Sequence, residues 1–415
     1  MPARVLAGLI LAAALAGQAS ADLRGHGGPV GALSVAGGQV LSGSFDTRAI
    51  LWDADGATAL RVLRFHDGNV TAVTFLPDGG LATGGQDGRV AVWAAGGAEP
   101  VLTTALHQAP IGGLAASDDG SELAVAGWDG QVQRIALSGA GARAEPRHQG
   151  MTMGVAWLAD GSLVSIGSDL RLVRQDRDGR LAAVGLPAQP NALAQRDGAL
   201  FVAFADGSVA RLTDDGVIEA RAELGNRPLA AISAGDEGVI AAMVSGAAWI
   251  LDPADLTVLH EFQAGQGPIW SVALAEGVVF TGGGDGLIRR WDAATGRPLG
   301  PGAGAEERMA DFDDGSRGAE VWRACALCHS LRPDDGNRAG PSLHRIFGRR
   351  IASVAGYDYS PALRSMDIIW TRETVAALFE HGPEVYTPGS RMPDQRVPDP
   401  ADRAALVEFL ARVTE

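Results

Sequence analysis

Cys325-Ala326-Leu327-Cys328-His329 is the stretch that determines the class of this 415-residue chain. Its two thiols lie three positions apart, so they face the same side of a helical turn. Both thiols can therefore add to the vinyl groups of one haem, and the histidine beside them can donate a ring nitrogen to the iron. This spacing is the attachment signature of a c-type haem. It predicts one covalent haem c, attached through both cysteines, with the histidine as a metal ligand.

A structural disulfide and half of a zinc site are the alternatives for a Cys-x-x-Cys pair. A zinc site requires further Cys or His residues at ligand spacing, and Cys325 and Cys328 are the only cysteines of the chain. A disulfide is compatible with an exported protein, but attachment of a haem would use both thiols. The haem is therefore the favoured interpretation of the motif.

From residue 316 onwards the chain resembles the mitochondrial-type class I cytochromes c. Residues 340–349, Gly-Pro-Ser-Leu-His-Arg-Ile-Phe-Gly-Arg, are similar to the family's stretch Gly-Pro-Asn-Leu-His-Gly-Leu-Phe-Gly-Arg. Residues 356–359, Gly-Tyr-Asp-Tyr, and Trp370 fall at the family's spacing for the groups that hold the haem propionates. Residues 386–392, Tyr-Thr-Pro-Gly-Ser-Arg-Met, are similar to the loop that delivers a methionine ligand. The resemblance implies an all-α class I cytochrome c domain at residues 316–415.

Two helices are expected at the ends of this domain. Gly318 and Trp322 lie on the first helix, for which Ser316 is a suitable N-cap. The last helix, over about residues 402–413, carries apolar residues at core spacing, namely Leu406, Phe409 and Leu410. We expect the last helix to cross the first near Trp322.

The resemblance implies a role for each residue of the haem site. His329 and Met392 are the axial metal ligands. The carbonyl oxygen of Pro341 accepts a hydrogen bond from His329, which fixes the imidazole ring and its tautomer. The residues around the propionates are Arg349, Tyr359 and Trp370.

The ligand pair also predicts the redox behaviour. The thioether of Met392 favours ferrous iron and raises the reduction potential. Leu363 and Leu378 stand where mitochondrial relatives have polar residues, so we expect a drier pocket and a shifted potential. Both axial positions are filled, which leaves no open site for oxygen or peroxide. All residues that hold and tune the haem are expected within residues 316–415.

Residues 1–21 have the organisation of a secretory signal peptide. Arg4 is followed by an apolar run from Val5 to Leu15, and small residues precede Asp22. The run is too short to span a bilayer, which disfavours the alternative of a membrane anchor. We therefore expect a protein that is exported to the periplasm, without an integral membrane segment and soluble after cleavage. Export also suits the haem, because thioether attachment takes place outside the cytoplasm.

Residues 22–302 are built from a repeat of about forty residues. Histidines recur at positions 26, 66, 107 and 148, and turn aspartates at 46, 87, 129, 169, 206 and 285. Short apolar alternations with Asp-Gly or Gly-Gly turns lie between them and predict four strands per unit. Gly25-His26 opens one unit, and Trp52-Asp53 and Trp291-Asp292 close two others. The repeat therefore resembles the WD-repeat propeller family.

Counting the units predicts a seven-bladed, all-β propeller, with six or eight blades as alternatives because the fifth and sixth units lack most of the marks. A propeller must close on itself to protect its edge strands. Residues 22–24 and residues 297–299 are alternatives for the segment that completes the last blade, and the sequence does not decide between them. The recurring histidines are spread around a ring. We expect each to bind the turn aspartate and the tryptophan of its own blade rather than a metal.

The charge of the chain restricts its partners. All 34 basic residues are arginines, and the net charge is −15. Residues 22–302 hold 31 acidic side chains against 19 arginines, whereas residues 316–415 hold 13 of each. Nucleic acid is therefore not an expected partner. Relatives of the haem domain dock through lysines, and the matching positions here are Glu384, Val385 and Arg391.

Three functions are compatible with this organisation, in which a short acidic linker at residues 303–315 joins the two domains. The first is an exported electron carrier whose propeller docks a redox partner, such as a dehydrogenase, a reductase or an oxidase. The second is an oxidoreductase with a catalytic cofactor in the propeller, and the third is a haem-linked sensor or assembly scaffold. The sequence offers no second haem motif and no ligand cluster for catalysis. We therefore expect an electron carrier and not an enzyme.

Overall fold

The computed structural model describes residues 22–299, apart from 106 and 266, and residues 314–414, apart from 324, 328, 334–339, 356, 358, 391 and 393–395. Of residues 146 and 327 it describes the backbone. The predicted signal peptide, most of the predicted linker and Cys328 lie outside the described residues.

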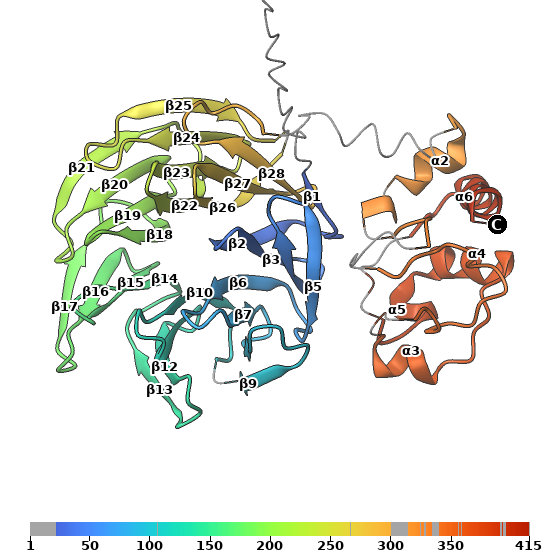
Figure 1. Ribbon diagram of the computed structural model, residues 1–415, viewed down its shortest axis with the longest axis horizontal. Coiled ribbons are helices and arrows are strands. Elements are labelled where there is room, and N and C mark those ends of the chain that lie inside the picture. The colour runs from blue at the N-terminus through green and yellow to red at the C-terminus, as the bar shows by residue number, and fades with distance from the viewer. Residues whose placement is uncertain are drawn as a thin grey trace, which may run out of the picture.

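Residues 22–299 form seven four-stranded antiparallel sheets, arranged around a common axis as the blades of a propeller (Figure 1). The predicted count of seven is confirmed, including the fifth and sixth blades. The first three blades are β2 (Val30–Ala36), β3 (Gln39–Ser44), β4 (Arg48–Asp53) and β5 (Thr58–Arg64); β6 (Val70–Phe75), β7 (Leu81–Gly85), β8 (Val90–Trp93) and β9 (Pro100–Thr104); and β10 (Ile111–Ala116), β11 (Glu122–Gly127), β12 (Gln131–Ala136) and β13 (Ala142–Pro146).

The fourth to sixth blades repeat this order with β14 (Thr152–Trp157), β15 (Leu163–Gly167), β16 (Arg171–Gln175) and β17 (Leu181–Gly185); β18 (Pro190–Arg196), β19 (Ala199–Phe204), β20 (Ser208–Leu212) and β21 (Ile218–Glu223); and β22 (Leu229–Gly235), β23 (Gly238–Met243), β24 (Ala247–Leu251) and β25 (Val258–Gln263). The second strand of a blade is buried on both faces, as in β19, whereas the outermost strand alternates, as in β21. This difference follows from the sequence, because β21, Ile-Glu-Ala-Arg-Ala-Glu, alternates as expected for a strand with one solvent-exposed face.

The seventh blade closes the ring with strands from both ends of the propeller. It consists of β26 (Ile269–Ala275), β27 (Val278–Gly283), β28 (Leu287–Asp292) and β1 (Leu23–Arg24). Leu23 pairs with Ile288 in the first half of β28. Residues 297–299 line the second half, where the amide of Asp292 donates to the carbonyl of Arg297 at 2.8 Å. Both segments that the sequence placed at this edge therefore contribute to closure.

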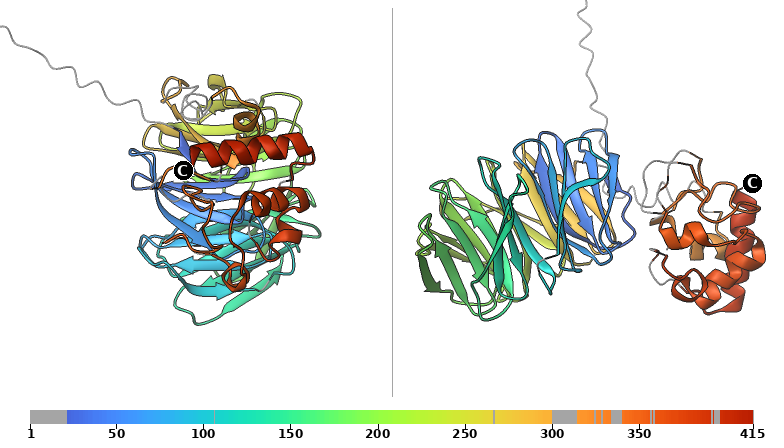
Figure 2. Two further views of the ribbon diagram at one scale, coloured as in Figure 1. Left: turned by 90° about the vertical axis from the view of Figure 1, so that its right-hand side faces the viewer. Right: turned by 90° about the horizontal axis from the view of Figure 1, so that it is seen from below.

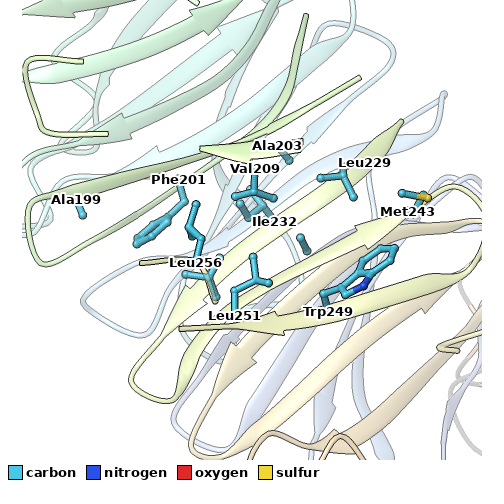
Figure 3. Packing of buried hydrophobic residues seen from close by; sticks show 12 residues of the cluster. Ala199, Phe201, Ala203, Val209, Leu229, Ile232, Met243, Trp249, Leu251 and Leu256 are labelled. Atoms are coloured by element: carbon cyan, nitrogen blue, oxygen red, sulfur yellow. The ribbon is translucent and has the colours of Figure 1, made fainter. Parts of the chain in front are cut away.

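Apolar clusters lie at all seven junctions between neighbouring blades. Figure 3 shows the junction of the fifth and sixth blades, where Phe201 of β19 lies beside Leu256, and where Leu229 of β22 and Trp249 of β24 belong to the same buried cluster. Full burial of a side chain of this size stabilises the folded state by about 1.5–3 kcal/mol. Because each blade shares a cluster with both neighbours, the ring holds its blades without a separate central core.

A buried network joins the histidine of the first blade to its turn. Nδ1 of His26 lies 3.0 Å from the carboxylate of Asp46, and Nε2 lies 2.7 Å from the hydroxyl of Ser42. The indole N–H of Trp52 donates to the same hydroxyl at 2.8 Å. The predicted bond from histidine to tryptophan is therefore wrong, because the serine hydroxyl joins the two side chains. The second blade repeats the arrangement with His66, Asp87, Thr83 and Trp93.

The third blade keeps the histidine and the aspartate but lacks the hydroxyl. Nδ1 of His107 lies 2.9 Å from Asp129. Val125, which is fully buried, occupies the position of Ser42 and Thr83. Nε2 of His107 is consequently buried without a hydrogen-bond partner among the described residues. Within that same part of the chain, no group of three or more His, Cys, Asp or Glu side chains is placed to hold a metal ion.

Residues 314–414 form a small helical domain. Its helices are α2 (Arg317–Trp322), the 3₁₀ turn η1 (Cys325–Leu327), α3 (Pro361–Ser365), α4 (Arg372–His381), α5 (Pro383–Tyr386) and α6 (Pro400–Val413). The hydroxyl of Ser316 caps α2 as predicted, accepting from the amide of Ala319. The predicted crossing of α2 and α6 is also present, because the ring centroids of Trp322 and Phe409 are 6.4 Å apart. None of the helices in the described parts of the chain is long and apolar enough to cross a membrane.

The helical domain lies beside the first blade of the propeller (Figure 2). The guanidinium of Arg64, at the end of β5, lies 4.6 Å from the ring centroid of Tyr357, a cation–π distance. Residues of the loops after β3 and β5 line a groove together with helical-domain residues, namely Phe45, Thr47, Asp67, Pro361, Gly389 and Met392. One end of the first two blades therefore faces the segments that carry Tyr357 and Met392.

Candidate cofactor site

Seven of the eight residues predicted for the haem site line one cavity of the helical domain: Cys325, His329, Pro341, Arg349, Tyr359, Trp370 and Met392. The eighth, Cys328, lies outside the described residues. The empty space between the walls is about 1190 Å³, its open mouth included. Leu363 and Leu378 also line this space. The cavity thus combines an imidazole, a thioether and a mainly apolar wall.

His329 is held in one orientation from two sides. Its Nδ1 lies 2.8 Å from the carbonyl oxygen of Pro341, so the predicted hydrogen bond is present and places the proton on Nδ1. The lone pair that a metal requires is therefore on Nε2. On the other side, Gly340 lies against the ring, and a Cβ at this position would be 2.5 Å from Cε1 of His329. Glycine is therefore required at residue 340 by the close approach of the imidazole ring.

The loop that carries Met392 is fixed by short polar contacts. The amide of Met392 donates to the hydroxyl of Ser390 at 3.1 Å, and the amide of Ser390 donates to the carbonyl of Thr387 at 2.9 Å. Gly389 has a φ of 78°, and its carbonyl accepts from the hydroxyl of Ser360 at 2.8 Å. The methionine is thus presented from a loop that is attached to the start of α3.

Arg349 and Trp370 are placed by paired backbone segments. The amide of Trp370 donates to the carbonyl of Arg349 at 2.9 Å, and the amide of Gly348 donates to the carbonyl of Trp370 at 2.8 Å. The guanidinium of Arg349 donates to the carbonyls of Ser342 and His344 at 2.7 and 2.9 Å. Burial lowers the pKa of this arginine, and it forms no ion pair among the described residues. A carboxylate in the cavity would compensate for its desolvation.

Burial also acts on Cys325 and Tyr359. Cys325 is 5% exposed, and burial raises the pKa of its thiol to about 12. Burial likewise raises the pKa of Tyr359, whose ring centroid lies 4.7 Å from that of Tyr357. Both side chains are therefore uncharged at neutral pH in this environment.

Two propeller residues also line the cavity, although the sequence pattern predicts a site formed by residues 316–415 alone. Asp46 and Arg48 flank the tip of the turn between β3 and β4, and both are buried. Burial raises the pKa of Asp46, but His26 and the amide of Gly27, which donates at 2.8 Å, lower it below its usual value. The walls of the cavity therefore extend beyond residues 316–415. The sequence contains one indication that the first blade differs from the second: residue 27 is glycine in the first repeat, whereas the equivalent residue of the second repeat is Asp67.

The residues of the cavity fit a haem. Imidazole and thioether are the axial ligand pair of c-type cytochromes, and here they line the same space as the first cysteine of the attachment motif. The half-buried guanidinium of Arg349 suits a propionate, and the leucines suit a porphyrin face. The described residues do not form the closed set of ligands that a structural zinc ion requires, because no three His, Cys, Asp or Glu side chains among them are grouped to hold a metal ion.

Comparison with known proteins divides the chain in the same way as the structure. The family model described as "WD domain, G-beta repeat" matches residues 17–53, 57–94 and 98–133. The model described as "Cytochrome c" matches residues 315–414. The first matches lie at the beginning of the propeller, and the second covers the helical domain.

Individual relatives are similar to a part of the chain that has the size of the helical domain. A cytochrome c of Cochliobolus lunatus is 39% identical over 103 residues, which are 25% of this chain and 94% of that protein. A cytochrome c of Arabidopsis thaliana is also 39% identical over 103 residues, 25% of this chain and 91% of its own. A cytochrome c homolog of Rickettsia conorii is 40% identical over 93 residues, 22% of this chain and 53% of that protein.

Proposed function

Since its helical domain makes this chain a member of the cytochrome c family, which implies an electron carrier with a haem, we propose that it carries one haem c. The haem is attached through Cys325 and Cys328, and its iron is ligated by His329 and Met392. The observation that carries the proposal is the single cavity that His329, Met392 and Cys325 share. The bound haem supplies one-electron exchange between ferrous and ferric iron.

The chain's own residues set the conditions of this exchange. The Pro341 carbonyl keeps the proton on Nδ1 of His329, so the imidazole stays a neutral donor of fixed orientation. Leu363 and Leu378 keep water from the wall of the cavity, and low polarity favours the less charged, ferrous state. Because the folded cavity buries Cys325 as a protonated thiol, and the thiolate is the better nucleophile, we expect attachment to precede closure of the domain.

Replacement of both motif cysteines tests the attachment. After denaturing electrophoresis, the exported full-length protein should stain for haem-dependent peroxidase activity, and Cys325→Ala with Cys328→Ala should not. Met366→Ala is a suitable control, because Met366 is absent from the residues that line the cavity, and it should keep the stained band. A band that persists in the double cysteine variant would overturn the assignment.

The propeller has a surface that suits a redox partner. Trp128, Met151 and Trp270 are exposed by 40%, 39% and 37%. They lie at turns between second and third strands or at the starts of first strands, which share one end of an antiparallel blade. The same end of the first blade carries Phe45 and Thr47, which face the helical domain. We propose that a dehydrogenase, reductase or oxidase docks on this end, with its basic groups facing the acidic propeller.

Electron exchange of the full chain tests the docking. Reduced protein should be reoxidised by membranes of the producing cells, more slowly at high salt because the acidic surface is screened. Trp128→Ser should slow this reaction several-fold, since aromatic anchors dominate interfaces. Val101→Ser is the matched control, because Val101 is 66% exposed on the outer strand β9. Ferricyanide, which needs no docking surface, should oxidise all three proteins equally, and equal slowing with both oxidants would contradict the proposal.

Export and the absence of catalysis are further parts of the proposal. Amino-terminal sequencing of the mature protein should begin at Asp22 if residues 1–21 are a cleaved signal peptide. An absorption spectrum should contain the bands of one haem c only. A second chromophore in stoichiometric amount would instead favour an oxidoreductase with a catalytic cofactor in the propeller.

A further inference from the structure

Arg48 is a buried cation whose guanidinium has no carboxylate within ion-pair distance among the described residues, although its charge helps to lower the pKa of Asp46. It belongs to the first blade, is 3% exposed and lines the cavity that also contains His329 and Met392. Its Nη1 donates to the hydroxyl of Thr47 at 2.5 Å. Its Nε has no hydrogen-bond partner, and the guanidinium forms no ion pair in the described part of the chain. Burial of an unpaired guanidinium is costly, whereas an anion in the cavity would compensate for it.

Comparison with the second blade identifies the carboxylate that Arg48 lacks. Arg89 occupies the equivalent position, two residues after the turn aspartate. Its guanidinium pairs with Asp67 and with Asp87, at 2.7 Å in each case, and it is 28% exposed. In the first repeat Gly27 stands where the second has Asp67. Arg48 thus lacks the carboxylate that holds its counterpart at the propeller surface.

Thr47 holds the guanidinium of Arg48 at a cost in backbone strain. Its φ is 69°, a left-handed conformation that is uncommon for a β-branched residue. Glycine occupies this position in the second and seventh blades, as Gly88 with φ 73° and Gly286 with φ 78°. Strained residues of this kind persist where the surrounding structure fixes them, and they cluster at ligand sites. The turn that faces the haem cavity therefore differs from those of the second and seventh blades at the residue that contacts Arg48, whereas the fourth blade has Leu170 with φ 59° at this position.

We propose that Arg48 is the ion-pair partner of a haem propionate, so that the propeller supplies one wall and one charge of the haem site. This inference rests on the covalent haem proposed above. The planar fork of arginine matches a carboxylate, and Arg349 lines the same cavity from the helical domain. The two propionates of one haem would each have an arginine. Arg64 of the first blade lies over the ring of Tyr357 in the helical domain. This contact holds the first blade next to the site.

The charge of Arg48 has a predictable effect on the redox equilibrium. A positive charge in the cavity favours ferrous over ferric iron, directly and by neutralising the propionate. At a distance of roughly 10 Å and an effective dielectric constant of about 20, one unit charge changes the ratio of reduced to oxidised protein about tenfold. Removal of the charge should therefore lower the reduction potential, whereas a lysine, which keeps the charge, should largely preserve it.

The experiment is a redox titration of the full-length holoprotein with Arg48→Met, Arg48→Lys and the matched control Arg89→Met. At the wild-type midpoint, Arg48→Met should show a reduced-to-oxidised ratio about tenfold below that of wild type. Arg48→Lys and Arg89→Met should stay near the wild-type ratio. Unfolding curves of the propeller for Arg48→Met and Arg89→Met identify any general loss of structure.

Gly27→Asp is a second variant that leaves the core intact. It restores the carboxylate of the second repeat at a partly exposed position and should draw Arg48 away from the cavity. The ratio of reduced to oxidised protein should therefore also fall in Gly27→Asp. The same substitution should lower this ratio by less in a protein that already carries Arg48→Met. If the haem is attached but Arg48→Met titrates like Arg89→Met, the inference is wrong. If no covalent haem is found, the proposed function fails instead.

Discussion

Val125→Thr in the third blade tests how the buried networks stabilise the propeller. Nε2 of His107 is buried there without a partner among the described residues. The equivalent atom of His66 in the second blade lies 2.9 Å from the hydroxyl of Thr83. Val125 and Thr83 occupy the same place in their strands, four residues before the turn aspartate. Threonine at residue 125 should therefore supply the missing hydrogen bond to His107.

The magnitude of the effect follows from two opposing terms. A buried polar atom without a partner costs about 1–3 kcal/mol, whereas loss of one buried methyl group costs about 0.8 kcal/mol. We expect Val125→Thr to raise the free energy of unfolding of the propeller by about 1 kcal/mol. Thr83→Val should have the opposite sign and a cost of about 2–4 kcal/mol, because it removes the partner of both His66 and Trp93.

Urea unfolding followed by tryptophan fluorescence measures these differences. Val202→Thr is the matched control, since Val202 is fully buried at the same position of the fifth blade, which contains no histidine. A hydroxyl without a partner there should lower the free energy of unfolding by about 1–3 kcal/mol. If Val125→Thr is as destabilising as Val202→Thr, the reasoning about the network is refuted.

Three further predictions concern other parts of the chain. Gly340→Ala places a Cβ 2.5 Å from Cε1 of His329, and overpacking of this kind should lower the stability of the helical domain by about 1–3 kcal/mol, measured by thermal unfolding of the holoprotein; an unchanged melting curve would show that the ring can move freely. Gly318→Val should prevent α2 from packing on α6, because even a Cβ would lie 2.2 Å from the carbonyl oxygen of Ala405, and loss of the far-ultraviolet helical signal would be expected. Burial lowers the pKa of His148 although Asp169 raises it, so its contribution to stability is fully present above about pH 6.5 and is lost as the pH falls; urea unfolding at pH 7.5 and 5.5 should show this decline, and His148→Asn should reduce it.

The propeller architecture could be predicted because the residues that recur in each repeat contact one another within their own blade. Regular spacing of histidines and turn aspartates identified the blades, and the seven junctions then follow from ring closure. The bond partners within a blade were less accessible. Ser42 stands out in the sequence only as a hydroxyl before the turn, and its bonds to both His26 and Trp52 depend on side-chain directions that spacing does not give.

The haem site was predictable for a different reason. The attachment motif and the family resemblance name its residues, and the structure places seven of them around one cavity. Arg48 was not predictable in this way, because its approach to the cavity is a contact between two domains that are distant in sequence. Periodicity makes Arg48 look like Arg89, and the two differ in sequence by Gly27 in place of Asp67 and by Thr47 in place of Gly88.

The near-infrared absorption of the oxidised full-length protein tests the central claim most directly. Iron with a methionine thioether ligand has a weak band in this region, so wild type and the control Met366→Ala should show it. Met392→Ala should lose the band, and its iron should then bind cyanide or carbon monoxide. Ligation by His329 and Met392 would be contradicted if the wild-type protein, with its haem attached, lacked the band, or if Met392→Ala retained it.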